Sequence, residues 1–174
     1  FLTLLLSLLL ILAVFPLWVS AEDVSGVTGD CSWRISGSTL TVSGNGNMAD
    51  YSSFRETPWY DYSYTFSTVK IKEGVKHIGS HSFNHYALMY LELPSGLISI
   101  GESAFVNAQI LDVTLPKSLV SLGDSAFEFC ERIKSVTFHE NFASLGSGAF
   151  GACSSLTTVS VADNNPNFNC VDNI

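Results

Sequence analysis

Apolar residues recur at a nearly constant spacing through the second half of the chain. Each copy begins with isoleucine or leucine followed by glycine, and successive copies start 22, 22 and 23 residues apart, at Ile78, Ile100, Leu122 and Leu145. Five residues after each start comes a phenylalanine, at Phe83, Phe105, Phe127 and Phe150. A repeat of this length is typical of a solenoid, in which each copy forms one coil that packs against its neighbours.

A short apolar-x-x-apolar-x-apolar stretch begins five or six residues after each phenylalanine and predicts a β-strand. Its last two apolar positions are Leu91 and Leu93, Val113 and Leu115, Val136 and Phe138, Val159 and Val161, after a partial first copy with Val69 and Ile71. Because side chains alternate along a strand, these residues point inward. The pattern predicts a β-rich solenoid of the leucine-rich repeat type, with right-handed coils, a parallel sheet and a 22–23-residue period.

Two further details of the coil follow from this pattern. The glycine after each start is expected to allow a tight bend or a positive φ angle. The residues around each phenylalanine are expected to form a short turn or 3₁₀-like bend, because too few residues remain for a full helix. The last two copies have one residue more between phenylalanine and strand. We expect the turns to absorb this extra residue.

The polar residues between the inward positions should form two columns on the outward face of the sheet. One column contains Lys70, Glu92, Thr114, Thr137 and Ser160. The adjacent column contains Thr68, Tyr90, Asp112, Ser135 and Thr158. Columns of small polar residues make a flat surface that suits a protein or glycan partner, and a solvated face without a partner fits the pattern equally well. This face is the candidate partner-binding site.

The segment before the repeats, residues 22–65, predicts an N-terminal cap and a connector. Residues 22–30 are rich in glycine, serine and threonine and are expected to form a loose leader. Residues 31–48 predict a β-hairpin, because Trp33 and Ile35 alternate with polar residues before a Ser-Gly-Ser turn, and Leu40 and Val42 alternate after it. A solenoid needs its first coil covered, so this hairpin is the candidate cap.

The connector, residues 49–65, is rich in aromatic residues. Trp59, Tyr60 and Tyr62 could form a platform for a carbohydrate, since exposed aromatic faces stack on sugars. The alternative, which we favour, is that Trp59 and its neighbours plug the hairpin onto the first coil, because tryptophan and tyrosine bury large areas.

The chain opens with a stretch without charge that ends at small residues, Val19-Ser20-Ala21. This pattern predicts a secretory signal peptide over residues 1–21, cleaved after Ala21. A membrane anchor is the alternative, since about 17–25 apolar residues span a bilayer; Pro16 and the small-residue exit favour cleavage. The missing initiator methionine and basic n-region suggest a fragment at its start. The repeats, residues 66–174 in about four coils, are expected to continue beyond Ile174. The predicted location is secreted or extracellular, with no membrane span after cleavage.

Charge and cysteine content narrow the function. The net charge of −8 argues against binding to nucleic acid or to an anionic membrane surface. Cys130 and Cys153 share one repeat position, which Tyr86 and Ala108 occupy in other copies. That variety favours a packing position, although a disulfide between the two remains open because neighbouring coils bring them close. Cys31 and Cys170 lie at opposite ends of the repeats and should not pair.

No cofactor, metal site or catalytic group is predicted. His77, His81 and His85 are four residues apart, a spacing that would form a metal-binding face on a helix. Gly79 and the repeat pattern argue against a helix there. No serine lies in a nucleophile-elbow context, so the sequence does not favour an enzyme.

The repeat unit resembles the BspA-like leucine-rich repeat family. The similarity is most specific in Leu122-Gly-Asp-Ser-Ala-Phe-Glu-Phe-Cys130 and in the copy from Leu145 to Leu156. The hairpin and connector also resemble the module that often precedes such repeats, and the tail from Asp163 to Phe168 is similar to the segment between them. Tyr86, Ala108 and Ser82 depart from the pattern and should loosen the first coils.

The resemblance implies a surface-exposed or secreted protein of bacteria or parasitic protists that adheres to host cells or matrix proteins, with no catalytic motif. The leading hypothesis is therefore a binding protein that uses the sheet face. The alternative is carbohydrate recognition by the connector.

Overall fold

The structure, a computed structural model, describes residues 23–84 and 87–169. The predicted signal peptide with its cleavage position, together with His85, Tyr86 and Cys170, lies outside these residues. The described part is almost entirely β structure and turns, and its only helices are the 3₁₀ helices η1 (Phe54–Glu56) and η2 (Tyr60–Tyr62). The strands are β1 (Val24–Thr28), β2 (Cys31–Ser36), β3 (Thr39–Gly44), β4 (Gly46–Asn47), β5 (Thr68–Ile71), β6 (Val75–Ile78), β7 (Tyr90–Glu92), β8 (Ser99–Ile100), β9 (Ser121–Leu122), β10 (Ser135–Phe138), β11 (Ser144–Leu145) and β12 (Thr158–Val161).

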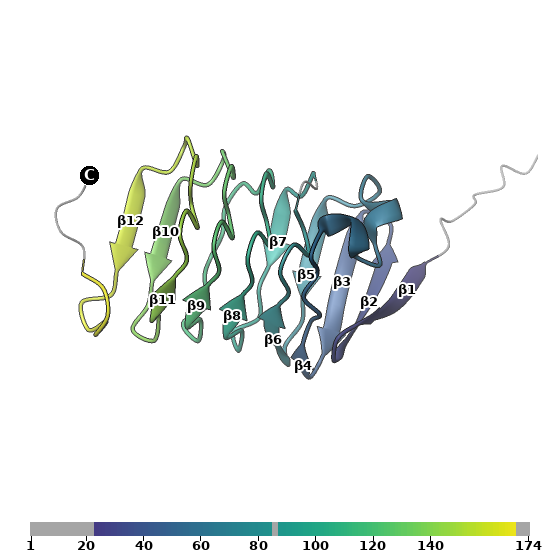
Figure 1. Ribbon diagram of the computed structural model, residues 1–174, viewed down its shortest axis with the longest axis horizontal. Coiled ribbons are helices and arrows are strands. Elements are labelled where there is room, and N and C mark those ends of the chain that lie inside the picture. The colour runs from purple at the N-terminus through teal and green to yellow at the C-terminus, as the bar shows by residue number, and fades with distance from the viewer. Residues whose placement is uncertain (1–22, 85–86, 170–174) are drawn as a thin grey trace, which may run out of the picture.

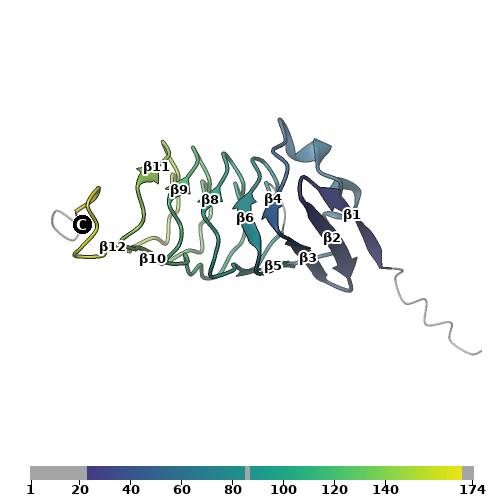
Figure 2. The ribbon, with the colours of Figure 1, turned by 90° about the horizontal axis from the view of Figure 1, so that it is seen from below.

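Strands from successive repeats stack in parallel along the long axis of the molecule (Figure 1). One row contains β3, β5, β7, β10 and β12, and the other contains β4, β6, β8, β9 and β11. Figure 2, turned by 90°, separates the two rows. In the second row Ser99 pairs with Ser121, and Ser121 pairs with Ser144. This is a solenoid-type arrangement, in which the chain returns to the same side once per repeat.

The phenylalanine segments join neighbouring coils by a separate set of backbone hydrogen bonds. The N–H groups of Phe83, Phe105 and Phe127 donate to carbonyls of the following coil at 2.8, 2.8 and 2.7 Å. In the second row the direction reverses, since the Gly101 and Gly123 N–H groups donate to the preceding coil. Each coil is therefore tied to both neighbours.

Aromatic rings stack in a continuous ladder inside the coils. The rings of Trp59, Phe83, Phe105, Phe127 and Phe150 follow one another with centroid separations of 5.4, 5.3, 5.0 and 5.3 Å and with planes no more than 15° apart. The first four of these side chains are fully buried. The connector tryptophan thus extends the phenylalanine ladder of the repeats by one ring.

The N-terminal hairpin continues the first row of strands. β3 pairs in parallel with β5, so that Leu40 lies beside Val69, and β2 pairs antiparallel with β3. The expectation of a loose leader over residues 22–30 is wrong, because β1 pairs antiparallel with β2 over its whole length. Gly26 of β1 lies against the ring of Trp33, where an added Cβ would come within 2.8 Å of the indole nitrogen. The edge strand fits here because glycine leaves room for the ring.

The glycines after the repeat starts do not have positive φ angles. In the described parts of the four phenylalanine turns, positive φ angles occur two positions later, at His81, Ser103, Ser125 and Gly148, and near the end of three turns, at Asn107, Phe129 and Ala152. At Gly123 an added Cβ would lie 2.5 Å from the Glu102 backbone nitrogen. These glycines therefore permit close contact between coils rather than a left-handed turn.

The first row of strands is interrupted in the third coil. The strand predicted to end at Val113 and Leu115 does not form, since residues 112–115 pair with neither β7 nor β10. β10 and β12 form a separate two-stranded sheet.

The interruption coincides with the change in repeat length. Phe105 and Ile110 are five residues apart, whereas Phe127 and Ile133 are six apart, as are Phe150 and Leu156. β10 and β12, which both follow a six-residue step, are paired, whereas residues 112–115 do not pair with β7 although both follow a five-residue step. The change in spacing therefore lies at only one side of the interruption, and the expectation that the turns absorb the extra residue stays a prediction.

Candidate functional site

The outward face of the first row carries the predicted columns of polar residues. In the ladders Thr68 pairs with Tyr90 and Lys70 with Glu92 on one side of the interruption. On the other side Ser135 pairs with Thr158 and Thr137 with Ser160. Lys70 Nζ lies 2.6 Å from Glu92 Oε1, as a surface ion pair. Asp112 and Thr114, in the interrupted coil, are exposed between the two ladders.

The same face extends over the N-terminal hairpin, which sequence reasoning treated only as a cap. Thr39 and Thr41 of β3 pair with Thr68 and Lys70, so they continue the two columns by one strand. Arg34 and Ser36 of β2, both exposed, continue them by another. The alternation of polar residues along the hairpin contained this signal, but the pairing of β3 with β5 was needed to place the residues on the same face.

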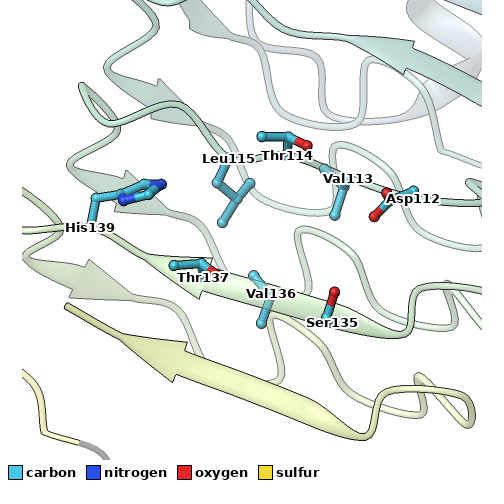
Figure 3. Close-up of a pocket in the computed structure, with 8 residues that line it drawn as sticks. All are labelled: Asp112, Val113, Thr114, Leu115, Ser135, Val136, Thr137 and His139. Carbon is cyan, nitrogen blue, oxygen red and sulfur yellow. The ribbon is translucent and has the colours of Figure 1, made fainter.

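A cleft of about 260 Å³ opens in this face where the row is interrupted. It is lined by Asp112, Val113, Thr114, Leu115, Ser135, Val136, Thr137 and His139. Figure 3 shows residues 112–115 on one side and β10 on the other, with His139 near one end and Asp112 near the other. Four of the predicted partner-binding residues, Asp112, Thr114, Ser135 and Thr137, therefore meet around one depression rather than on a flat sheet.

The aromatic connector is only partly exposed. Trp59 is fully buried, and its indole nitrogen donates a hydrogen bond to the Ser82 carbonyl at 2.9 Å. Its ring consequently has no exposed face for a sugar. Tyr60 and Tyr62 are half-buried, whereas the Tyr64 side chain is almost fully exposed.

Two of the buried cysteines act as hydrogen-bond donors between coils. Cys31, Cys130 and Cys153 are all free thiols. Cys130 Sγ donates to the Phe105 carbonyl at 3.1 Å, and Cys153 Sγ donates to the Phe127 carbonyl at 3.2 Å. Burial, with a smaller effect of the neighbouring Cys153, raises the pKa of the Cys130 thiol to about 12. The thiol therefore stays protonated at neutral pH and keeps its role as donor.

The histidines form local polar contacts. His77 Nδ1 lies 2.8 Å from Ser99 Oγ, and His77 Nε2 lies 3.1 Å from Asp50 Oδ1. Partial burial raises the pKa of Asp50, but hydrogen bonds from Ser80 and His77 outweigh this effect and hold the pKa below its usual value. Within residues 23–84 and 87–169, no group of three or more histidine, cysteine, aspartate or glutamate side chains is placed to hold a metal ion. In the same ranges, no helix combines the length and apolar character needed to cross a membrane.

Comparisons with known proteins identify the repeats. The profile of the BspA type leucine-rich repeat region matches residues 56–170 in six copies. No significant match was found among curated proteins.

Three solved structures share the fold. A leucine-rich repeat protein from Eubacterium ventriosum is 21% identical, with a TM-score of 0.68 over 82% of this chain and 45% of its own. One from Bacteroides ovatus is 23% identical, with a TM-score of 0.55 over 78% of this chain and 40% of its own. The pneumococcal vaccine antigen PcpA is 18% identical, with a TM-score of 0.52 over 87% of this chain and 53% of its own. The chain spans less than half the length of the first two structures.

Proposed function

The chain belongs to the BspA type leucine-rich repeat family, and from this premise we propose that it is a secreted or cell-surface protein that adheres to a host-cell or matrix protein. The outward face of the first row of strands is the proposed contact surface. The observation that carries the proposal is the in-register polar face that runs from β2 through β3, β5 and β7 and resumes at β10 and β12. The matched family is one of repeat proteins and is not a catalytic family.

The composition of this face supports a protein partner. It combines hydroxyl side chains with the half-exposed ring of Tyr90, which is 54% exposed, and tyrosine is enriched at protein interfaces. The net charge of −8 disfavours nucleic acid and anionic membranes as partners. The similarity to a vaccine antigen, PcpA, concerns the fold and adds a precedent for the architecture.

We also propose the domain organisation that accompanies this function. Residues 1–21 form a signal peptide cleaved after Ala21, which accounts for secretion. Residues 22–65 form the cap and connector, and residues 66–174 form leucine-rich repeat coils of 22–23 residues. The pairing of β3 with β5 supports the cap, because it places the hairpin at the end of the first coil.

The alternative is a glycan-binding connector. Because Trp59 is buried, sugar binding by the connector would depend on Tyr60 and Tyr62. The exposed Tyr64 lies close to them in sequence. Tyr60 already packs against the Phe54 ring, with centroids 5.5 Å apart and planes tilted by 60°, and this contact covers part of the half-buried ring. The protein-binding face has more exposed polar residues and is the preferred site.

Placing positive charge on the sheet face should weaken adhesion. The test variant carries Tyr90→Lys, Thr158→Lys and Ser160→Lys, and its binding to epithelial cells and immobilised matrix proteins is measured. We expect at least a roughly tenfold loss, because long charged side chains would have to be desolvated in the interface. Gln109→Lys, Ala143→Lys and Ser154→Lys form a control with the same added charge, placed outside the two ladders of the face.

The outcome separates the two proposals. Unchanged adhesion of the test variant, with a native circular dichroism spectrum, would remove the sheet face from consideration. A loss confined to a Tyr60→Ala, Tyr62→Ala double variant would favour the glycan-binding connector instead.

A further inference from the structure

The cleft in the outward face leaves backbone carbonyl groups without partners. In the paired parts of the row, the Ser67 carbonyl accepts hydrogen bonds from Met89 and Tyr90 at 2.9 and 3.2 Å. The Lys134 carbonyl likewise accepts from Thr157 and Thr158 at 3.0 and 3.2 Å. Leu111 occupies the same repeat position, but its carbonyl accepts no hydrogen bond from any described residue. Leu111 directly precedes the lining residue Asp112. The carbonyl of Val113, which lines the cleft, accepts no hydrogen bond from a described residue either.

The cleft also contains one carboxylate that nothing in the described chain neutralises. Asp112 is exposed at one end of the cleft and makes no hydrogen bond or ion pair with the residues that the structure describes. Among the described residues no lysine or arginine lines the cleft, and its lining includes the hydroxyl-bearing residues Thr114, Ser135 and Thr137. The backbone carbonyls and the carboxylate can only accept hydrogen bonds, whereas the hydroxyls and the His139 ring, which also lines the cleft, can donate as well. It is therefore the carboxylate without a partner that favours a positively charged ligand rich in donors.

Apolar side chains form the remaining part of the lining. Val113, Leu115 and Val136 are buried and contribute to the walls. A side chain with an apolar stem and a cationic end would match this arrangement, because the stem packs on the walls while the charged group reaches the acceptors. Arginine fits better than lysine, since its planar guanidinium presents five N–H donors to several acceptors at once and pairs bidentately with a carboxylate.

We propose that the cleft between residues 112–115 and β10 is a binding subsite for an arginine side chain of the protein partner. The guanidinium pairs with the Asp112 carboxylate and donates to the unpaired carbonyls of Leu111 and Val113, and the methylene groups pack against Val113 and Val136. That the arginine comes from a protein partner rests on the proposed function, whereas binding of a guanidinium by the cleft does not.

An NMR titration tests the subsite without the partner. The probe is N-acetyl-arginine N-methylamide, and the matched control probe contains citrulline, which is nearly isosteric but neutral. The arginine probe should shift the backbone amides of residues 111–115 and 135–139 in a saturable way at millimolar concentrations, and the citrulline probe should bind at least about tenfold more weakly. Asp112→Asn should weaken binding of the arginine probe to a similar extent. Asp61→Asn, which removes an exposed carboxylate in the connector, should leave it unchanged.

Several results would overturn the subsite. These are equal binding of the two probes, undiminished binding to the Asp112→Asn variant, or shifts located only away from the cleft. Failure of the proposed function gives a different result. In that case the arginine probe binds the cleft as predicted, but the lysine variants of Tyr90, Thr158 and Ser160 adhere normally. If those variants lose adhesion but the native protein does not bind the arginine probe, the sheet face is retained as the contact surface and the arginine subsite is rejected.

Discussion

Replacing Phe105 with alanine is expected to lower the free energy of unfolding by about 3–5 kcal/mol. Phe105 is fully buried and stacks between Phe83 and Phe127 at centroid distances of 5.3 and 5.0 Å. The substitution leaves a cavity in the middle of the ladder and removes two aromatic contacts at once. Because each coil is stabilised mainly by its neighbours, the loss should affect the whole stack, and urea unfolding followed by circular dichroism measures it.

Phe129→Ala is the matched control for this prediction. Phe129 lies in the next repeat, two residues after the ladder residue Phe127, but its side chain is 43% exposed. Its replacement should lower the free energy of unfolding by less than about 1 kcal/mol, since little apolar area leaves the core. Equal losses for the two variants would contradict the stacked ladder as the main stabilising feature.

Replacing Gly123 with alanine should cost about 3 kcal/mol or more, or prevent folding. An added Cβ would lie 2.5 Å from the Glu102 backbone nitrogen and 2.7 Å from the Gly101 carbonyl carbon. Both are backbone atoms of the preceding coil, so they cannot move without disturbing the hydrogen bond from the Gly123 N–H to the Ile100 carbonyl. The two coils would have to separate, and the urea midpoint should fall accordingly.

Gly96→Ala is the control that measures the effect of replacing a glycine where no backbone atom of another coil lies close to the added Cβ. The nearest atom to its added Cβ is Lys76 Nζ at 3.0 Å, the mobile end of a long side chain. Its effect on the free energy of unfolding should stay within about 0.5 kcal/mol. If Gly123→Ala were equally mild, the close approach of coils at the repeat glycines would not be a determinant of the fold.

The repeat pattern was sufficient to predict the family and most of the core, although Val159, predicted to point inward, and the repeat start Leu145 are 45% and 43% exposed. The spacing of isoleucine, glycine and phenylalanine identified a leucine-rich repeat chain, and the family match confirms this. Phe83, Phe105 and Phe127 are fully buried, as inward positions of a coil should be. Such predictions succeed because every copy must bury the same set of apolar positions, so that a match of the pattern in successive copies seldom arises by chance.

Elements decided by distant contacts were harder to predict. β1 has a composition typical of a loop, with serine, glycine and threonine, and it becomes a strand because β2 offers an edge and Gly26 leaves space for Trp33. The role of the repeat glycines was likewise hidden, since the atoms that crowd them belong to the preceding coil. Neither contact is visible in the residues nearby in sequence.

The candidate site was predicted in its composition but not in its shape. The residues of the two columns lie beside one another in the ladders, as the alternation of polar positions indicated. The cleft at Asp112 and Thr114 was missed, although one border of it coincides with the extra residue between Phe127 and Ile133. We infer that the extra residue displaces β10 from residues 112–115, because neighbouring coils fix both ends of the turn.

Deletion of Arg132 tests most directly whether this extra residue opens the sheet. Arg132 is exposed and makes no hydrogen bond or ion pair with the described residues, and its deletion restores the five-residue step found between Phe105 and Ile110. Amide hydrogen exchange measured by NMR then reports the pairing. The Ser135 amide, which should exchange quickly in the native protein, should become protected by the Leu111 carbonyl. The Thr158 amide, now bonded to the Lys134 carbonyl at 3.2 Å, should lose protection as the break moves by one coil. A Ser135 amide that still exchanges quickly, with Thr158 still protected, would contradict the account.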